Sequence, residues 1–248
     1  MPDLGNSLVI FIGFSLSLLM LAWLGNQVSL HIQIPVYLLT RSQGLAMVAL
    51  FLVFWPGVMM HEGAHWLMAR LLGLRTGKFR VWPEMRKDSL RLGSVTVQNG
   101  NPLAISLVGM APLIVGVPII ALIGHRIFDA YGVTEAFAQG RWLDGIEVFW
   151  LALRSTDGPL WAFFLFAIAN AMMPSASDRA AVMPVLQYAA LATLFYFLLG
   201  LPLTPLSAAL AWLAPVLQDL SSALIFTILL DLAVLAVLLP IRLLLGGF

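Results

Sequence analysis

Apolar runs recur along the chain, and each is close to the roughly twenty residues that an α-helix needs to cross a hydrocarbon core of ~30 Å. Of the 248 residues, 61% are hydrophobic and only 10% are charged. This composition excludes an ordinary soluble domain. We therefore predict an all-α integral membrane protein in which residues 1–248 form one polytopic membrane domain.

Six membrane spans are predicted. In the first, within 1–25, no Lys or Arg precedes the apolar core, so we expect a retained span and no cleaved signal peptide. The segment between the third and fourth spans, 125–158, is polar and aromatic by turns, which is typical of an amphipathic interfacial segment. The other five spans are predicted at 45–74, 102–124, 159–173, 182–203 and 221–245.

The cations of the chain predict its orientation. They crowd the loop after the second span, 75–101, and this excess marks a cytoplasmic loop. We expect the protein in the cell membrane (plasma or inner), with the lipid bilayer as a partner. A formal charge of +1 without a basic stripe argues against nucleic acid. Because the chain has no cysteine, any metal must be held by His and carboxylates.

The second span contains the pattern H-E-x-x-H, formed by His61, Glu62 and His65. On a helix, two imidazoles four residues apart project from one face and can chelate one zinc ion. Glu62 lies beside that face, where it can take a proton from water whose pKa zinc lowers to roughly 7. The alternative is a buried polar cluster that holds helices together.

A catalytic zinc site has three protein ligands, and Asp178 is the main candidate for the third. It follows Pro174, which should end the fourth span and leave irregular backbone near the site. In another interpretation, Ser175 or Ser177 caps the fifth helix and Asp178 lies in its first turn. The two interpretations do not exclude each other.

Asp231, in the sixth span, is a rival for this position. At 1.5 Å per residue, His61, His65 and Asp178 lie about 26, 32 and 30 Å from the outer ends of their spans, but Asp231 lies only about 15 Å from its own. We therefore predict that Asp178 completes the metal site. Asp231 should pair with a polar group of a neighbouring span.

These motifs resemble those of the site-2 protease family of intramembrane zinc metalloproteases. The resemblance covers about 45–184 and consists of a span with H-E-x-x-H, a loop with strand-like segments and, two spans later, Asn170, Pro174 and Asp178. Pro174 is four residues after Asn170 where the family has three, and Arg179 stands where the family has Gly. The first span and its loop, 1–44, and the C-terminal spans in 185–248 lie outside it.

The resemblance implies a three-helix catalytic core that cleaves membrane-spanning segments of other proteins. It implies His61, His65 and Asp178 as ligands of Zn²⁺ and Glu62 as the general base. It also implies that Asn170 binds substrate or stabilises the oxyanion.

The loop after the second span alternates polar and apolar residues on both sides of the turn-like sequence RKDS, 86–89. This pattern predicts a short cytoplasmic β-hairpin-like segment. Its edge could hold a peptide in extended form, or its cations could meet anionic lipid.

We predict a zinc-dependent intramembrane endopeptidase whose substrate is a transmembrane protein. The alternative from another class is a zinc-binding membrane transporter, or a catalytically inactive protease-like protein that binds membrane proteins. A transporter should show polar groups at several depths along a pathway, and the outer half of this chain's spans is poor in them.

The predicted orientation can be tested by cysteine labelling, since the natural chain contains no cysteine. A single cysteine at Ser89 should be protected from a membrane-impermeant reagent in intact cells and react after permeabilisation, because the cation-rich loop faces the cytoplasm. A single cysteine at Gln139, in the loop predicted on the opposite side, should react in intact cells. Reaction at position 89 in intact cells would contradict the orientation.

Overall fold

The computed structural model describes residues 4–77, 84–86, 89–91, 97–98 and 100–246. Helices dominate this part of the chain, as predicted for an all-α membrane-type fold. They are α1 (Leu4–Thr40), α2 (Gln43–Leu71), α3 (Pro102–Arg126), α4 (Ala130–Ala138), α5 (Trp142–Leu153), α6 (Gly158–Ala171), α7 (Ala176–Leu198) and α8 (Thr204–Leu244).

Five of these helices are long and apolar enough to cross a membrane, namely α1, α2, α3, α7 and α8. The chain is therefore a membrane protein. Helix α6 lies almost where the fourth span was predicted, but its 14 residues cover only about 21 Å, less than a hydrocarbon core. Its neighbour α7 begins after a short connector.

Two helices are much longer than the apolar runs that predicted them. Helix α1 continues to Thr40, and α8 begins at Thr204, well before the predicted start of the sixth span at 221. Hydropathy identifies only the part of a helix that is apolar enough to lie in the hydrocarbon core. The backbone hydrogen bonds of a helix are satisfied within it, so the helix continues through residues such as Gln27 and Asp219.

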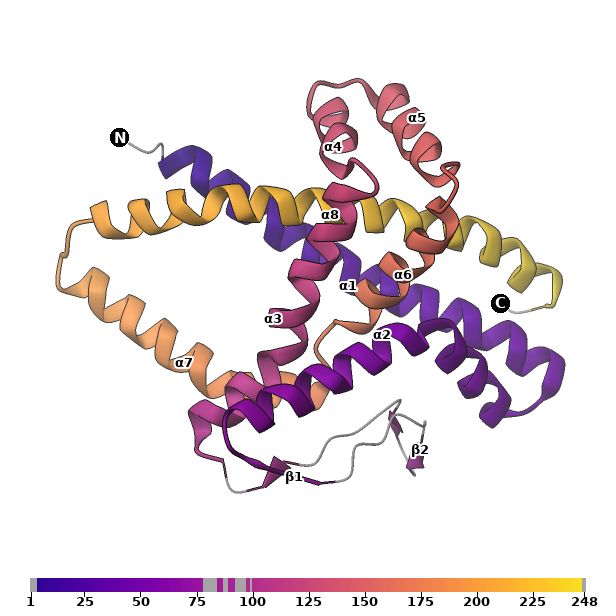
Figure 1. The fold of residues 1–248 in the computed structure, drawn as a ribbon, viewed down its shortest axis with the longest axis horizontal. Helices are drawn as coiled ribbons and strands as arrows, with labels where there is room; N and C mark the ends of the chain where they lie inside the picture. Colours follow the sequence, from indigo (N-terminus) through magenta and orange to yellow (C-terminus); the bar gives the residue numbers. More distant parts are fainter. Residues whose placement is uncertain (1–3, 78–83, 87–88, 92–96, 99, 247–248) are drawn as a thin grey trace.

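Figure 1 shows α1 and α8 crossing the molecule together along its long axis, and the two helices pack against each other. Helix α2 packs against α1, α3 and α6. An aromatic stack of Phe54 on Phe166, with ring centroids 5.4 Å apart, joins α2 to α6. Helix α7 packs on α3, and most of its length is exposed.

The sequence explains where α2 and α3 begin. Ser42 accepts a hydrogen bond from the amide of Leu45, and Asn101 accepts one from the amide of Ala104 at 2.7 Å. Such side chains satisfy donors that a helix leaves free in its first turn. Pro102 follows Asn101 in the first turn of α3, where its missing N–H costs nothing.

Short strands lie between α2 and α3. β1 (Arg75–Thr76) pairs with β4 (Val97–Gln98), and β2 (Glu84–Arg86) pairs with β3 (Ser89–Arg91), both antiparallel. Arg86 lies opposite Ser89. Most of the two segments predicted to form a hairpin, 78–85 and 90–98, lies outside the described residues.

Glycine allows α2 and α6 to approach closely near the H-E-x-x-H motif. A Cβ atom added to Gly57 would lie 2.1 Å from the carbonyl oxygen of Ala167 and 2.6 Å from Cβ of Ala171. Because the first of these atoms is backbone, a side chain at position 57 would force the two helices apart. Gly57 is one helical turn before His61, so this contact also sets the position of the motif.

We predict that Gly57→Ala lowers the midpoint of thermal unfolding in detergent by about 5 °C or more, as expected for overpacking in a protein of this size. Gly13→Ala in α1 is the matched control, since nothing lies within 4 Å of an added Cβ there. The control should be neutral or slightly stabilising, because Ala favours a helix over Gly. Equal midpoints for the two variants would contradict the close packing of α2 on α6.

Candidate metal centre

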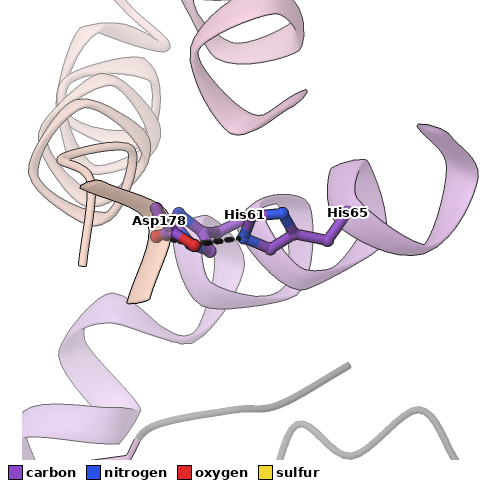
Figure 2. A group of neighbouring side chains, drawn as sticks. All are labelled: His61, His65 and Asp178. Carbon is purple, nitrogen blue, oxygen red and sulfur yellow. Dashed lines mark hydrogen bonds and ion pairs between the residues drawn. The ribbon is translucent and has the colours of Figure 1, made fainter. Parts of the chain in front are cut away.

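Two histidines of α2 and one aspartate of α7 meet inside the bundle (Figure 2). His61, His65 and Asp178 are all buried, and each offers a ligand atom within 4.8 Å of the others. Asp178 is more than one hundred positions after the two histidines in the sequence. The packing of α2 and α7 on α3 brings the three residues together. This group could hold a metal ion, as predicted from the motif and from the depth of Asp178.

Helix α3 orients His65. The Nδ1 atom of His65 lies 2.7 Å from the carbonyl oxygen of Val108. Because a carbonyl only accepts, Nδ1 carries the proton, and the lone pair of a neutral imidazole is then on Nε2, which faces the site. Metal-binding histidines usually have such a partner on the second nitrogen. The sequence gives no signal for this partner, since it is a backbone atom.

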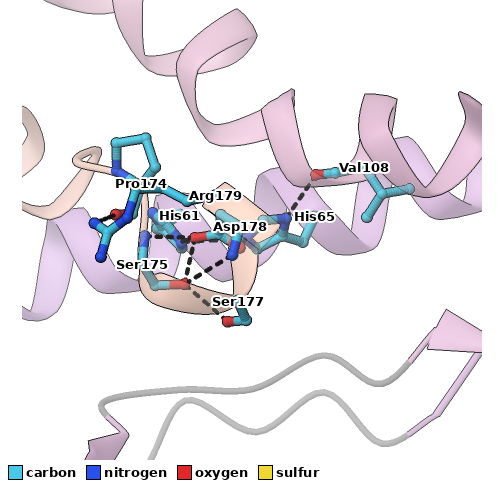
Figure 3. A network of polar contacts seen from close by, with 8 residues as sticks. All are labelled: His61, His65, Val108, Pro174, Ser175, Ser177, Asp178 and Arg179. Carbon is cyan, nitrogen blue, oxygen red and sulfur yellow. Dashed lines mark hydrogen bonds and ion pairs between the residues drawn. The ribbon is translucent and has the colours of Figure 1, made fainter. Parts of the chain in front are cut away.

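Asp178 is held by the first turn of its own helix (Figure 3). Ser175 is the N-cap of α7 and forms a capping box with Asp178. Oδ2 of Asp178 accepts hydrogen bonds from the amide of Ser175 at 2.8 Å and from its hydroxyl at 2.6 Å. These bonds fix the carboxylate, while Oδ1 lies 3.2 Å from Nε2 of His65. The predicted cap at Ser175 is confirmed, and it coexists with the role of Asp178 in the metal group.

The connector between α6 and α7 carries Pro174, as predicted for a break in the helical path. Helix α6 ends at Ala171, and the carbonyl of Pro174 accepts a hydrogen bond of 2.8 Å from the Arg179 guanidinium. The connector is not helical, so its carbonyls need partners other than the amides of a helix. Arg179 therefore stabilises the irregular backbone just before the aspartate.

One turn of α3 also holds the start of α7. The hydroxyl of Ser106 donates to the carbonyl of Ala181 at 2.5 Å. A Cβ added to Gly109 would lie 3.2 Å from the carbonyl oxygen of Asp178. The segment 106–109 thus touches α7 with two residues and His65 with a third. The sequence analysis did not predict this contact, although small residues such as Ser106 and Gly109 in a membrane span permit close approach of another helix.

The donor atoms are close enough to one another to share one cation, although the two histidines approach different oxygens of Asp178. Nε2 of His61 is 3.1 Å from Nε2 of His65 and 3.4 Å from Oδ2 of Asp178, and Nε2 of His65 is 3.2 Å from Oδ1. Ligands about 2.0–2.1 Å from one tetrahedral ion are about 3.3 Å from each other. The residues present therefore fit a cation with two nitrogen ligands and one carboxylate.

Glu62 lies beside this group. It directly follows His61 in α2 and is 9% exposed. A buried carboxylate next to a metal position is the usual arrangement for a proton acceptor.

The amide nitrogen of Asn170 has partners other than the histidines. This nitrogen donates to the Phe166 carbonyl at 3.0 Å and to Oδ1 of Asp231 at 2.8 Å. Its amide oxygen faces Gly25 of α1, where an added Cβ would lie 2.4 Å away. The expectation that Asp231 pairs with a polar group of a neighbouring span is thus confirmed. The partner is the asparagine that the family resemblance had implied at the catalytic site.

We predict that His61→Ala, His65→Ala and Asp178→Ala each reduce bound Zn²⁺ from about one ion per chain to near zero, because three protein ligands are needed for a stable site. Asp231→Ala should keep its zinc, although it leaves the Asn170 donor unpaired and costs about 1–3 kcal/mol of stability. Metal analysis of detergent-purified protein measures both. Zinc lost from Asp231→Ala and retained by Asp178→Ala would reverse the assignment.

Comparisons of the chain with protein-family models, with curated proteins and with solved structures find no significant match. What this chain can do must therefore be argued from its own residues.

Proposed function

We propose that this protein is a zinc-dependent intramembrane endopeptidase of the site-2 protease type. The observation that carries the proposal is the convergence of His61, His65 and Asp178 beside Glu62, buried in a bundle of membrane-spanning helices. Ionisable groups are expensive inside a membrane and usually have a function there.

The donor set favours zinc. Two imidazoles and one carboxylate are a common ligand set of catalytic zinc, which leaves a fourth position for water or substrate. Hard cations such as Mg²⁺ and Ca²⁺ prefer oxygen ligands. Cysteine ligands, typical of closed structural zinc sites, are not available in this chain.

Zinc bound at this site would polarise the scissile carbonyl and acidify a water molecule. Glu62 accepts the proton of the attacking water and passes it to the leaving amine. The Val108 carbonyl keeps His65 in one tautomer, and the cap at Ser175 keeps the Asp178 carboxylate in one orientation. Burial of all three ligands lowers the local dielectric and so strengthens the electrostatic part of catalysis.

The substrate class follows from the surroundings of the site. A peptide that reaches a site enclosed by α2, α3 and α7 must be compatible with an apolar surface, as a membrane-spanning segment is. A helix protects its peptide bonds, so such a segment has to unwind before cleavage. The strands that follow α2 offer an edge on which it could be held extended. From the excess of cations in the loop after α2, we infer that this side faces the cytoplasm.

For Asn170 we propose a positioning role. Its pairing with Asp231 ties α6 to α8 just before the connector that leads to Asp178. To contact substrate directly, the Asn170 amide would have to break its hydrogen bond with Asp231.

The proposal is tested with Glu62→Gln in proteoliposomes that contain a generic transmembrane substrate. The variant should bind Zn²⁺ as the wild type does and cleave at least about 100-fold more slowly, since only the general base is lost. Glu135→Gln, an exposed position on α4, is the matched control and should cleave normally.

Cleavage by Glu62→Gln at the wild-type rate would overturn the mechanism. A wild-type protein that binds zinc but cuts no transmembrane substrate would contradict the proposed activity and support a protease-like binder. Zinc transport into the vesicles would support a transporter.

A further inference from the structure

Helix α5 has an apolar side that is largely exposed in the described part of the chain, although one face of Trp142 stacks on Phe137 of α4 with ring centroids 5.3 Å apart. Trp142, Leu143, Ile146 and Trp150 are 63%, 81%, 44% and 48% exposed. At 100° per residue, these positions fall within about 100° of one another around the helix. They form one continuous stripe, which we call the α5 stripe.

The neighbouring side of the same helix is charged and also exposed. Asp144 and Glu147 lie there, and Arg141 at the start of the helix forms a 2.9 Å ion pair with Asp144. A helix side in the hydrocarbon core would avoid these charges, and a side in bulk water would not carry two tryptophans and two large aliphatic residues together. An amphipathic helix with both sides exposed suits the boundary between lipid and water.

The rest of α5 is packed firmly, so the stripe is exposed by the fold itself. Phe149 lies on the inner side, with its ring centroid 5.0 Å from that of Phe226 in α8. Gly145 leaves room for the ring of Phe137, because an added Cβ would lie 2.3 Å from it. Helix α4 is in turn joined to α8 by a 3.0 Å hydrogen bond between the hydroxyls of Thr134 and Ser222.

The position of α5 along the chain agrees with a membrane boundary. The candidate span α3 ends in His125 and Arg126, and α4 begins four residues later. In Figure 1 the α4–α5 hairpin lies at one end of α3, and the strands lie at the other end. The 25 residues of α3 rise about 37 Å, close to one bilayer with its interfaces.

We propose that α5 is an interfacial anchor that lies along the membrane surface remote from the strands. The α5 stripe enters the boundary between head groups and acyl chains, where tryptophan is favoured. Asp144 and Glu147 face water. Arg141 and Arg154 balance these two acids, so a zwitterionic bilayer suffices and anionic lipid is not required. This anchor does not depend on the proposed protease activity.

The test uses single cysteines, since the natural chain has none. Spin labels at positions 143 and 146 of the stripe and at 144 and 147 of the charged side are placed in the full chain, in vesicles of phosphatidylcholine. Their accessibility to oxygen, which concentrates in lipid, is compared with that to a water-soluble nickel chelate. Labels at Leu16 in α1 and Gln139 after α4, both exposed, are the lipid and water references.

We expect labels 143 and 146 to match the lipid reference and labels 144 and 147 to match the water reference. High nickel accessibility at all four positions would place the hairpin in water and overturn the anchor. Low accessibility of 143 and 146 to both reagents would show that protein covers the stripe, such as a second copy of the chain, and would also overturn it. Size-exclusion profiles of the labelled variants verify that each one is folded.

Discussion

The meeting of one carboxylate with two imidazoles is the contact around which the centre of this molecule is organised. Asp178 approaches His61 and His65 at 3.4 and 3.2 Å, and through it α7 is joined to α2. Both helices also form hydrogen bonds with the same turn of α3: α2 through Val108 and α7 through Ser106. Three lone-pair donors in so small a buried volume repel one another unless a cation or a proton lies between them. A cation bound by all three residues would remove this repulsion.

The same constraint governs the other polar groups in the bundle. Burying a polar group without a partner is costly, and two pairs of polar residues from different helices reduce this cost. Asn170 meets Asp231, and His31 of α1 meets Arg242 of α8 at 3.2 Å. The first pair joins α6, within the predicted core, to α8, and the second joins α1 to α8, both of which lie outside that core. The C-terminal helix is thus tied to α6, the helix that precedes the connector to Asp178.

Local patterns in the sequence predicted the candidate ligands of the metal group and the order of the helices. A helical count indicated Asp178, although residues 172–175 between α6 and α7 are not helical. The spacing of His61 and His65 needs only a helix, and the cap at Ser175 needs only the first turn of α7. Each depends on short-range geometry that the sequence encodes directly. For the same reason the apolar runs indicated helices in the right order.

Features that depend on tertiary packing were not predictable. Asn170 and Asp231 are about sixty positions apart, and nothing in their local patterns distinguishes a catalytic amide from one that satisfies a buried acid. The Val108 carbonyl has no sequence signal at all. The true ends of α1 and α8 were missed because hydropathy measures suitability for lipid, whereas a helix ends where its hydrogen bonds or its packing end.

The most direct test of a zinc centre at His61, His65 and Asp178 is X-ray absorption at the zinc edge of the loaded protein. If zinc is the bound metal, as proposed, we expect four-coordinate zinc with two imidazoles and oxygen ligands at about 2.0–2.2 Å, the oxygens coming from Asp178 and one exchangeable water. The imidazoles are recognised by their outer-ring scattering. A six-coordinate oxygen shell, or fewer than two imidazoles per zinc, would contradict the site.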